Sequence, residues 1–499
     1  MSRLALVLLP LLILSSLVMN GCSHSPAPTE QSPALKFTPP SQWQSDNQAT
    51  IADSSQAHDT ETPSSHDLSS ALDLAPALDL APALQAWLFT VPDPQLKRLI
   101  TEALRNNFQL NASAALLDSA YARTISSGAA RKLQASHSVD ASRSRQTIPS
   151  GPQAITRNST SLGFGVDIAW QPDIWRKLKK QQQASVLDYQ SSQQTHQFAQ
   201  LSLVSDLIKA WYQVIEASLL QDLSEQRLSN LRDNLDILNQ GYQAGLNGPL
   251  DIYLAQADLQ QEKARLANQA IVSVAASHQL QLLLGQYPSG TLTVTNPLPL
   301  LSEPIPAGIP AQLLARRPDI VAALRQLQAD ELNAKVAHLR RLPAFRLTSQ
   351  IGTRSEEFKD LFSSDFLISS LFASLVTPLL DGGTLKAEEQ IAYNLVKASE
   401  FNYQSTALNA FREVEFALTQ DQFLKQQHAA TQQSAIQFQQ AQQLAFEQYQ
   451  AGLVNYITVL ESQRRAFDAS RSEIQLRNQI IQNRINLHLA LGGDFGPNH

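Results

Sequence analysis

The sequence predicts a mostly α-helical protein with a smaller membrane β-barrel part, built from a duplicated unit. One sequence motif occurs twice: YQAGLNGPLDIYLAQA starts at Tyr242, and YQAGLVNYITVLESQR starts at Tyr449, 207 positions later. The two copies align without a gap. Two long segments, 173–240 and 384–451, contain neither Gly nor Pro. Alternating apolar and small or polar residues precede each of them. Each unit is therefore predicted to be a β-hairpin, a long helix, a tight turn and a shorter helix.

Composition narrows the class of protein. The 499 residues are 43% hydrophobic, which supplies a large buried surface, and the formal net charge of −6 argues against a nucleic-acid partner. Gly is scarce and Gln occurs in runs, which suits long helices. The histidines show no metal-ligand spacing. The Walker loop, the Gly-x-Ser-x-Gly elbow and the His-Glu-x-x-His motif are all missing from the sequence. We therefore expect that the protein is not an enzyme and that it binds neither a cofactor nor a metal ion.

The N-terminus is predicted to be a secretory signal over residues 1–21. Arg3 precedes an apolar run that is too short for a transmembrane helix, and Cys22, the only cysteine, follows it. A cysteine at this place is typical of a bacterial lipoprotein, in which the thiol receives a lipid. Met19 departs from the usual pattern, because Leu is common three residues before the cysteine. The alternative is plain signal cleavage that leaves a thiol.

The mature chain is predicted to begin with a low-complexity tether over residues 22–86. This stretch is rich in Pro, Ser, Ala, Thr and Asp, and it can bury little surface. Order is expected to begin near Trp87, and Asp93-Pro94 is a good start for a helix. A first structural repeat, a linker and a second structural repeat are then expected at 87–290, 291–308 and 309–494.

Barrel strands are expected at about 135–171 and about 342–378. Within the first range, apolar residues alternate with small or charged ones at Phe164, Val166, Ile168 and Trp170. Such alternation fits strands that face lipid on one side and water on the other, and a half-buried soluble sheet gives the same pattern. About four strands cannot close a membrane barrel, and open edges in lipid would stay unsatisfied. Copies of the chain must therefore combine, and three would supply about twelve strands.

Two helical hairpins are expected at about 173–284 and about 384–491. Apolar residues step by four, three and four at Val204, Ile208, Trp211 and Ile215. This spacing favours coiled-coil packing over an ordinary bundle helix, which is usually much shorter. Gly245 and Gly452 in the YQAG turns permit the left-handed backbone that reverses a chain, with helix capping alone as the plainer interpretation.

The second hairpin carries polar residues that the first one lacks. Ile457, Glu461 and Arg464 lie at i, i+4 and i+7, so they share one face of a helix. A ring of such residues could narrow and latch a pore. The alternative is a solvated surface pair worth a few tenths of a kcal/mol.

Several motifs follow one another along the chain from Trp87 to Asp494. They are Asp93-Pro94-Gln95-Leu96, Ile309-Pro310-Ala311-Gln312-Leu313-Leu314, Arg316-Arg317-Pro318-Asp319-Ile320, Pro378-Leu379-Leu380-Asp381-Gly382-Gly383 and both YQAG turns. Together they resemble the TolC-like outer-membrane efflux channels, most closely the lipoprotein branch that serves resistance-nodulation-division pumps. One position departs from that family: Arg176 stands at the first barrel exit where Gly is usual, which puts the local turn in doubt.

The resemblance implies a homotrimer whose twelve-stranded barrel lies in outer-membrane lipid and continues as an α-helical periplasmic tunnel. It implies a lipid-anchored, passive and gated conduit for small toxic compounds, which meets a periplasmic adaptor (membrane fusion) protein and an inner-membrane pump. The implied periplasmic gate is Ile457, Glu461 and Arg464, with Asp251 as a weaker candidate. The implied adaptor-contacting tip residues are Tyr242, Gly245, Leu246, Asn247, Tyr449, Gly452, Leu453 and Asn455.

Two other functions stay open at the level of sequence. The same fold can serve as the exit duct of a type I protein secretion system. A periplasmic coiled-coil scaffold without a pore is the other alternative, and it would have no membrane strands. The lipoprotein start and the Arg-Arg-Pro-Asp-Ile motif favour efflux.

Overall fold

The computed structural model describes Gln42 and residues 93–150, 153–246, 248–290, 297–299 and 310–493. All of them belong to one unit, Pro39–His499. Several predictions fall outside the described residues: the signal, the lipidation site Cys22, the onset of order near Trp87 and the tip residue Asn247. The same holds for the tether apart from Gln42, and for most of the linker.

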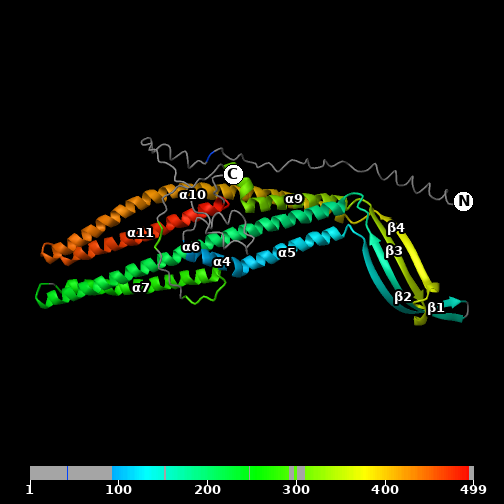
Figure 1. Cartoon of the computed structure of the whole chain (residues 1–499), viewed down its shortest axis with the longest axis horizontal. Coiled ribbons are helices and arrows are strands. Elements are labelled where there is room, and N and C mark those ends of the chain that lie inside the picture. The colour runs from blue at the N-terminus through cyan, green and yellow to red at the C-terminus, as the bar shows by residue number, and fades with distance from the viewer. Residues whose placement is uncertain are drawn as a thin grey trace. The chain divides into compact units, whose positions relative to one another are not determined.

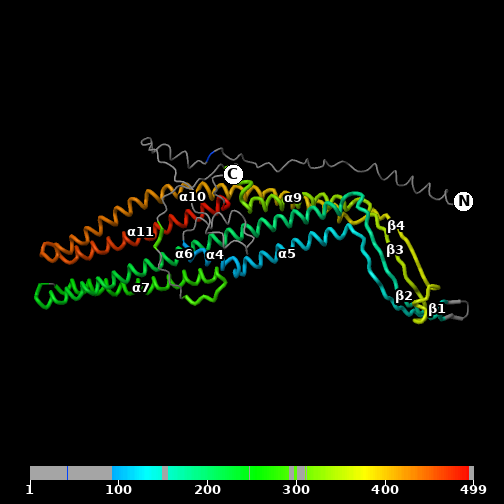
Figure 2. Tube along the Cα trace, in the orientation of Figure 1, coloured from blue at the N-terminus to red at the C-terminus, as the bar shows by residue number. Residues whose placement is uncertain are grey.

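Helices dominate the chain, which confirms the predicted fold class (Figures 1 and 2). The elements of the first half are α4 (Pro94–Asn106), α5 (Phe108–Ala129), β1 (Gln134–Ser150), β2 (Gln153–Trp170), α6 (Lys177–Gln243) and α7 (Pro249–Leu283). Those of the second half are η3 (Pro310–Gln312), α8 (Leu313–Arg316), α9 (Pro318–Leu339), β3 (Ala344–Ser355), η4 (Phe358–Asp360), η5 (Ser364–Phe366), β4 (Leu367–Val376), α10 (Thr384–Gln450) and α11 (Tyr456–Ala490).

The long helices repeat without any change of length. The helices α6 and α10 have 67 residues each, and α7 and α11 have 35 each. Lys177 and Thr384, which begin the longer pair, are 207 positions apart, and so are Pro249 and Tyr456, which begin the shorter pair. One inserted residue would rotate everything after it by roughly 100° about the helix axis and move the apolar seam. An unchanged length therefore preserves the packing of both hairpins.

The four strands form one antiparallel sheet in the order β1-β2-β3-β4. The two repeats meet in its middle, where Gly165 of β2 lies opposite Gly352 of β3. A Cβ on Gly352 would lie 2.7 Å from the Cα of Gly165 and 2.4 Å from the carbonyl oxygen of Phe164. The backbones can therefore approach this closely only because residue 352 is a glycine, whereas a Cβ on Gly165 would meet no atom nearer than 3.5 Å.

Two helices extend the repeat unit that the sequence analysis predicted. The helices α5 and α9 have 22 residues each and lead directly into β1 and β3. They pack along the long helices: α5 lies on α6, and α9 lies on both α6 and α10 (Figure 1). Each half is therefore a helix, a β-hairpin, a long helix and a return helix.

The main core lies where α4, α6, α7 and α11 meet. All four heptad positions predicted in α6 are buried, and Trp211 among them is 0% exposed. Leu96 and Ile100 of α4 contribute to the same cluster, as do Leu280 of α7 and Ile485 of α11. The capped start of α4 is as predicted, because the Asp93 side chain accepts a bond from the Gln95 N–H at 2.8 Å.

Arg176 adopts the left-handed backbone that Gly supplies in the second repeat. It precedes α6 with φ 57° and ψ 26°, and its counterpart Gly383 precedes α10 with φ 87° and ψ 6°. Among the described residues, Arg176 is the only residue other than Gly with a positive φ. Asp173 supports the turn by accepting bonds from the N–H groups of Leu178 and Lys179 at 2.9 Å and 2.7 Å. The turn therefore survives the departure from the family pattern.

Substituting Arg176→Gly is expected to stabilise the protein by about 0.5–1 kcal/mol. Relief of the left-handed strain, about 1–2 kcal/mol, outweighs the entropy that Gly adds to the unfolded chain. Thermal unfolding followed by circular dichroism should show a higher midpoint. The matched control is Lys179→Gly, which places Gly inside the first turn of α6 and should lower the midpoint. A lower midpoint for both variants would contradict the strain at Arg176.

Candidate functional site

The two YQAG turns end their helices in the same way. Gly245 has φ 76°, as predicted, and its N–H donates to the carbonyl of Tyr242 at 2.9 Å. The N–H of Leu246 donates to the carbonyl of Gly241 at 2.8 Å. The second turn repeats both bonds at 2.9 Å around Gly452, which has φ 72°. This pair of bonds is the Schellman motif, so both glycines are required by the backbone.

The turns present apolar side chains to solvent. Leu246 is 81% exposed and Leu453 is 74% exposed, and Tyr242 is about half exposed. Two further predicted tip residues, Tyr449 and Asn455, have structural contacts. Tyr449 packs against Tyr456 with ring centroids 5.6 Å apart. The side chain of Asn455 caps α11 by accepting a bond from the Thr458 N–H at 3.2 Å.

The start of α11 is fixed against the first hairpin, which we define as α6 with α7. Tyr456 and Val459 of α11 are buried in one cluster with Leu238 of α6 and Ala255 of α7. Burial raises the pKa of Tyr456 above its ordinary value. The two turns therefore lie together at the same end of the molecule, opposite the sheet (Figure 2).

The predicted gate residues share one exposed face of α11. Glu461 accepts a bond from Arg464 Nη2 at 2.8 Å and another from Arg465 Nε at 2.8 Å. These bonds from Arg465 and Arg464 hold the pKa of Glu461 below its usual range. Ile457 lies one turn earlier on the helix and is 46% exposed. The side chains thus combine one anion, two cations and an apolar residue on a solvent-facing surface.

Arg465 is the part of this group that sequence reasoning missed. It lies at i+4 from Glu461, a spacing at which helix ion pairs form as readily as at i+3. Asp251, the weaker gate candidate, caps its own helix. Its carboxylate accepts a bond from the Gly248 N–H at 3.3 Å and so caps the start of α7.

The Arg-Arg-Pro-Asp-Ile motif has a structural role far from the turns. The Arg317 side chain is 4% exposed and binds both carboxylate oxygens of Asp319. Its Nη1 donates to Glu413 of α10 at 2.7 Å and to the carbonyl of Ala490, at the end of α11, at 3.2 Å. Burial lowers the pKa of Arg317, but its bonds to Asp319 and Glu413 more than offset this and raise it. Arg317 thus fastens α9 to the second hairpin, which we define as α10 with α11.

Two absences concern the described residues only. In that part of the chain, no His, Cys, Asp and Glu side chains gather in a group that could hold a metal ion. Nor does any helix there combine the length and the apolar character needed to cross a membrane.

Comparisons with known proteins agree with this fold. The chain is similar to the pyoverdine export outer membrane protein OpmQ of Pseudomonas putida, with 28% identity, covering 82% of this chain and 88% of that protein. It is similar to the cation efflux system protein CusC of Escherichia coli, with 29% identity and the same coverage. A crystal structure of CusC has a TM-score of 0.74 at 26% identity, covering 84% of this chain and all of that one.

The family model for the outer membrane efflux protein matches residues 99–286 and 309–493, well over half of the chain. The resemblance inferred from the motifs is thereby confirmed, and with it an outer-membrane location and a part in efflux. The chain belongs to the outer membrane efflux protein family.

Proposed function

We propose that three copies of the chain form a passive, gated conduit that carries small toxic compounds across the outer membrane. The observation that carries this proposal is the four-stranded sheet, in which β1 and β4 are edges within the described residues. Unpaired edges in lipid are costly, and four strands are too few to close a barrel. Pairing β4 of one copy with β1 of the next would remove every edge. Three copies would supply about twelve strands.

The register of the sheet supports a lipid face and a water face. Directly opposed residues share a face, so Val166 and its partner Ile351 lie on the same side of the sheet. The exposed apolar residues on this side are Val139, Phe164, Val166, Trp170, Ile351, Leu367, Leu371 and Leu375. On the other side, Ser138 bonds to Asp167 at 3.0 Å, and Nη2 of Arg354 lies 3.7 Å from Oδ2 of Asp140. The edge strand β4 also exposes Ile368, Phe372 and Val376 on that side, so the contrast between the two faces comes from β1, β2 and β3.

The helices next to the two edges support the same ring. The edge strand β1 follows α5, which exposes Leu116 and Ile125. The edge strand β4 precedes α10, which exposes Leu395 and Phe416. A head-to-tail contact between copies would cover these apolar residues while it pairs the strands. Such contacts form a ring when the rotation from one copy to the next closes, as the pairing of β4 with β1 in three copies requires.

The remaining parts of the proposal concern the lipid anchor in the outer membrane and the helical turns in the periplasm. Cys22 would carry the lipid that anchors the chain to the outer membrane. The exposed turn residues Tyr242, Leu246 and Leu453 would contact a periplasmic adaptor protein, and through it an inner-membrane pump. Ile457 and the group around Glu461 would narrow the periplasmic mouth. The conduit would have no catalytic step of its own.

A pair of arginine substitutions tests the barrel. Leu371→Arg places a charge in the middle of β4 on the proposed lipid face, where it should cost about 2–4 kcal/mol. Gln350→Arg, the control, places the same charge on the proposed water face. We expect outer-membrane fractions to contain trimers of the wild type and of Gln350→Arg, and little Leu371→Arg. Native mass spectrometry and membrane fractionation measure this. Equal amounts of both variants, or a wild type that stays monomeric, would contradict the proposal.

A further inference from the structure

A buried ionic cluster lies where the two hairpins face each other. Glu262 of α7 has a side chain that is 2% exposed. Its Oε2 lies 3.3 Å from Nε of Arg227 in α6 and 3.6 Å from Nη1 of Arg265 in α7. The ring of Phe467, on α11 of the other hairpin, covers both guanidinium groups, with centroid distances of 4.4 Å to Arg227 Cζ and 5.5 Å to Arg265 Cζ.

The cluster is incompletely satisfied. Arg227 Nη1, Arg265 Nη1 and Glu262 Oε1 are buried, and none of these three atoms has a hydrogen-bond partner in the part of the chain that the structure describes. Burial lowers the pKa of Arg227, and nearby Glu262 opposes that change. A buried charged group without its full set of partners is costly in a dry site and gains most when water reaches it.

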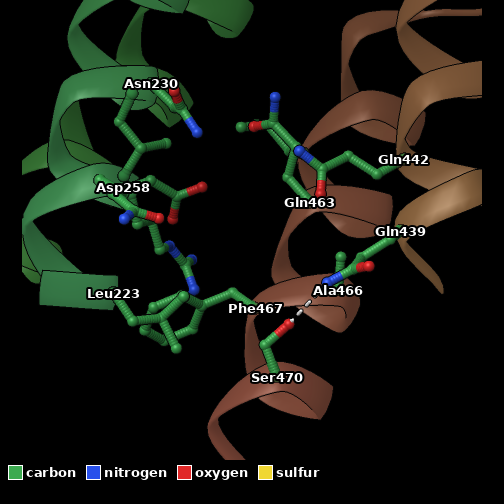
Figure 3. A pocket seen from close by; sticks show the side chains of 13 residues that line it. Leu223, Asn230, Asp258, Gln439, Gln442, Gln463, Ala466, Phe467 and Ser470 are labelled. Carbon is green, nitrogen blue, oxygen red and sulfur yellow. Dashed lines mark hydrogen bonds between the residues drawn. The ribbon is translucent and has the colours of Figure 1, made fainter. Parts of the chain in front are cut away.

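A cavity of about 170 Å³ lies beside the cluster and is walled by both hairpins (Figure 3). Arg227, Asn230 and Asp258 line it from the first hairpin, and Gln442 and Phe467 line it from the second. This volume is large enough for a few water molecules, and the amide and carboxylate walls offer them partners. Parting of the hairpins would therefore admit water directly to the guanidinium nitrogens that donate no hydrogen bond within the described residues.

The cluster occurs in only one of the two repeats. The positions 207 residues after Arg227, Glu262 and Arg265 are Ser434, Ala469 and Ser472. The second hairpin thus carries neither charge pair at the matching place. A contact that merely stabilised a helical hairpin would be useful in both copies.

We propose that Phe467, stacked on Arg227 and Arg265 around Glu262, is a clamp that holds the two hairpins together, and that water reaching the two guanidinium groups from the adjacent cavity releases it. The inference rests on the proposed function, because it assumes a conduit that opens when the hairpins part. Cation–π contacts are strongest when they are desolvated. Water that reaches the guanidinium groups therefore weakens the contact while it hydrates the charges. The clamp thus has a closed state, in which the ring shields the guanidinium groups, and an open state, in which water hydrates them.

The clamp differs physically from the exposed group around Glu461. Exposed ion pairs are screened by salt, and buried ones much less so. Glu461 and Arg464 have side chains that are 41% and 57% exposed. In the clamp, Glu262 is 2% exposed, Arg227 15% and Arg265 31%. Effects of clamp variants should therefore persist in 1 M KCl, at a Debye length of about 3 Å, while effects of Glu461 variants should fade.

The test uses Phe467→Leu and Glu262→Gln, two conservative changes on different helices, with Phe411→Leu as a control at a buried aromatic in α10. Ser470 lines the cavity, so Ser470→Cys reports on access to it. We expect both clamp variants to label several-fold faster at position 470 with a small thiol reagent, located by peptide mass. We also expect longer channel openings in planar bilayers in 1 M KCl.

Labelling and openings that match the control in both variants would overturn the clamp. Faster labelling with no conductance in any protein, including Glu461→Ala with Arg464→Ala, would support parting of the hairpins and would instead contradict the conduit. The two failures are therefore distinguishable.

Discussion

Replacing Arg317 by Ala is expected to lower the free energy of unfolding by about 3 kcal/mol, at the lower end of the range for breaking a buried ion pair. The guanidinium holds Asp319 through two bonds of 2.9 Å and 2.7 Å, and it reaches Glu413 and the carbonyl of Ala490. Ala would remove the guanidinium donor from all three acceptors, and among the described residues Asp319 would keep only its bond from the Ile320 N–H at 3.0 Å. The loss is moderated because the side chain of Glu413 is 42% exposed and can be hydrated.

Two variants make this prediction specific. Arg316→Ala removes the neighbouring exposed arginine and should change the free energy of unfolding by less than about 0.5 kcal/mol. Arg317→Lys keeps the charge but loses the planar guanidinium group, so its loss of free energy of unfolding should lie between those of Arg316→Ala and Arg317→Ala. Chemical denaturation of the detergent-solubilised protein measures all three. A value for Arg317→Ala close to that of Arg316→Ala would show that the buried network contributes little.

Trp211→Ala is expected to lower the free energy of unfolding by about 3–5 kcal/mol, because it leaves a cavity at the centre of the main core. The side chain is fully buried among residues of α4, α6, α7 and α11. Its Nε1 has no hydrogen-bond partner among the described residues, so the ring acts there by volume alone. Trp211→Phe, the matched control, should therefore cost much less. Thermal unfolding checks both variants, and equal losses would contradict a packing role.

The parts of the fold that sequence predicted best are those with a local physical cause. Segments without Gly or Pro became α6 and α10, and Gly245 and Gly452 took the left-handed backbone that their turns require. The helices α5 and α9 were not predicted, because their stability comes from packing on the long helices. The left-handed backbone at Arg176 was also beyond prediction, since it runs against the preference of the residue and is held by its surroundings.

The contacts at the candidate sites also differ in whether a local sequence pattern predicts them. The bond between Glu461 and Arg464 follows from the i, i+3 spacing on a helix. The bond between Glu461 and Arg465 could have been predicted from the i, i+4 spacing in the same way. The contact of Phe467 with Arg227 joins positions far apart in the sequence on two hairpins. It depends on how each hairpin is rotated about its axis, which no local pattern specifies.

The central claim, a gated conduit, is tested most directly by single-channel conductance in planar bilayers at low salt. The wild type is compared with a double variant, Glu461→Ala with Arg464→Ala, which removes the exposed ionic group at the proposed mouth. Low salt is chosen because screening weakens exposed pairs. We predict a small conductance for the wild type and a larger one for the variant. Properly inserted trimers that pass no current in either form would contradict the account.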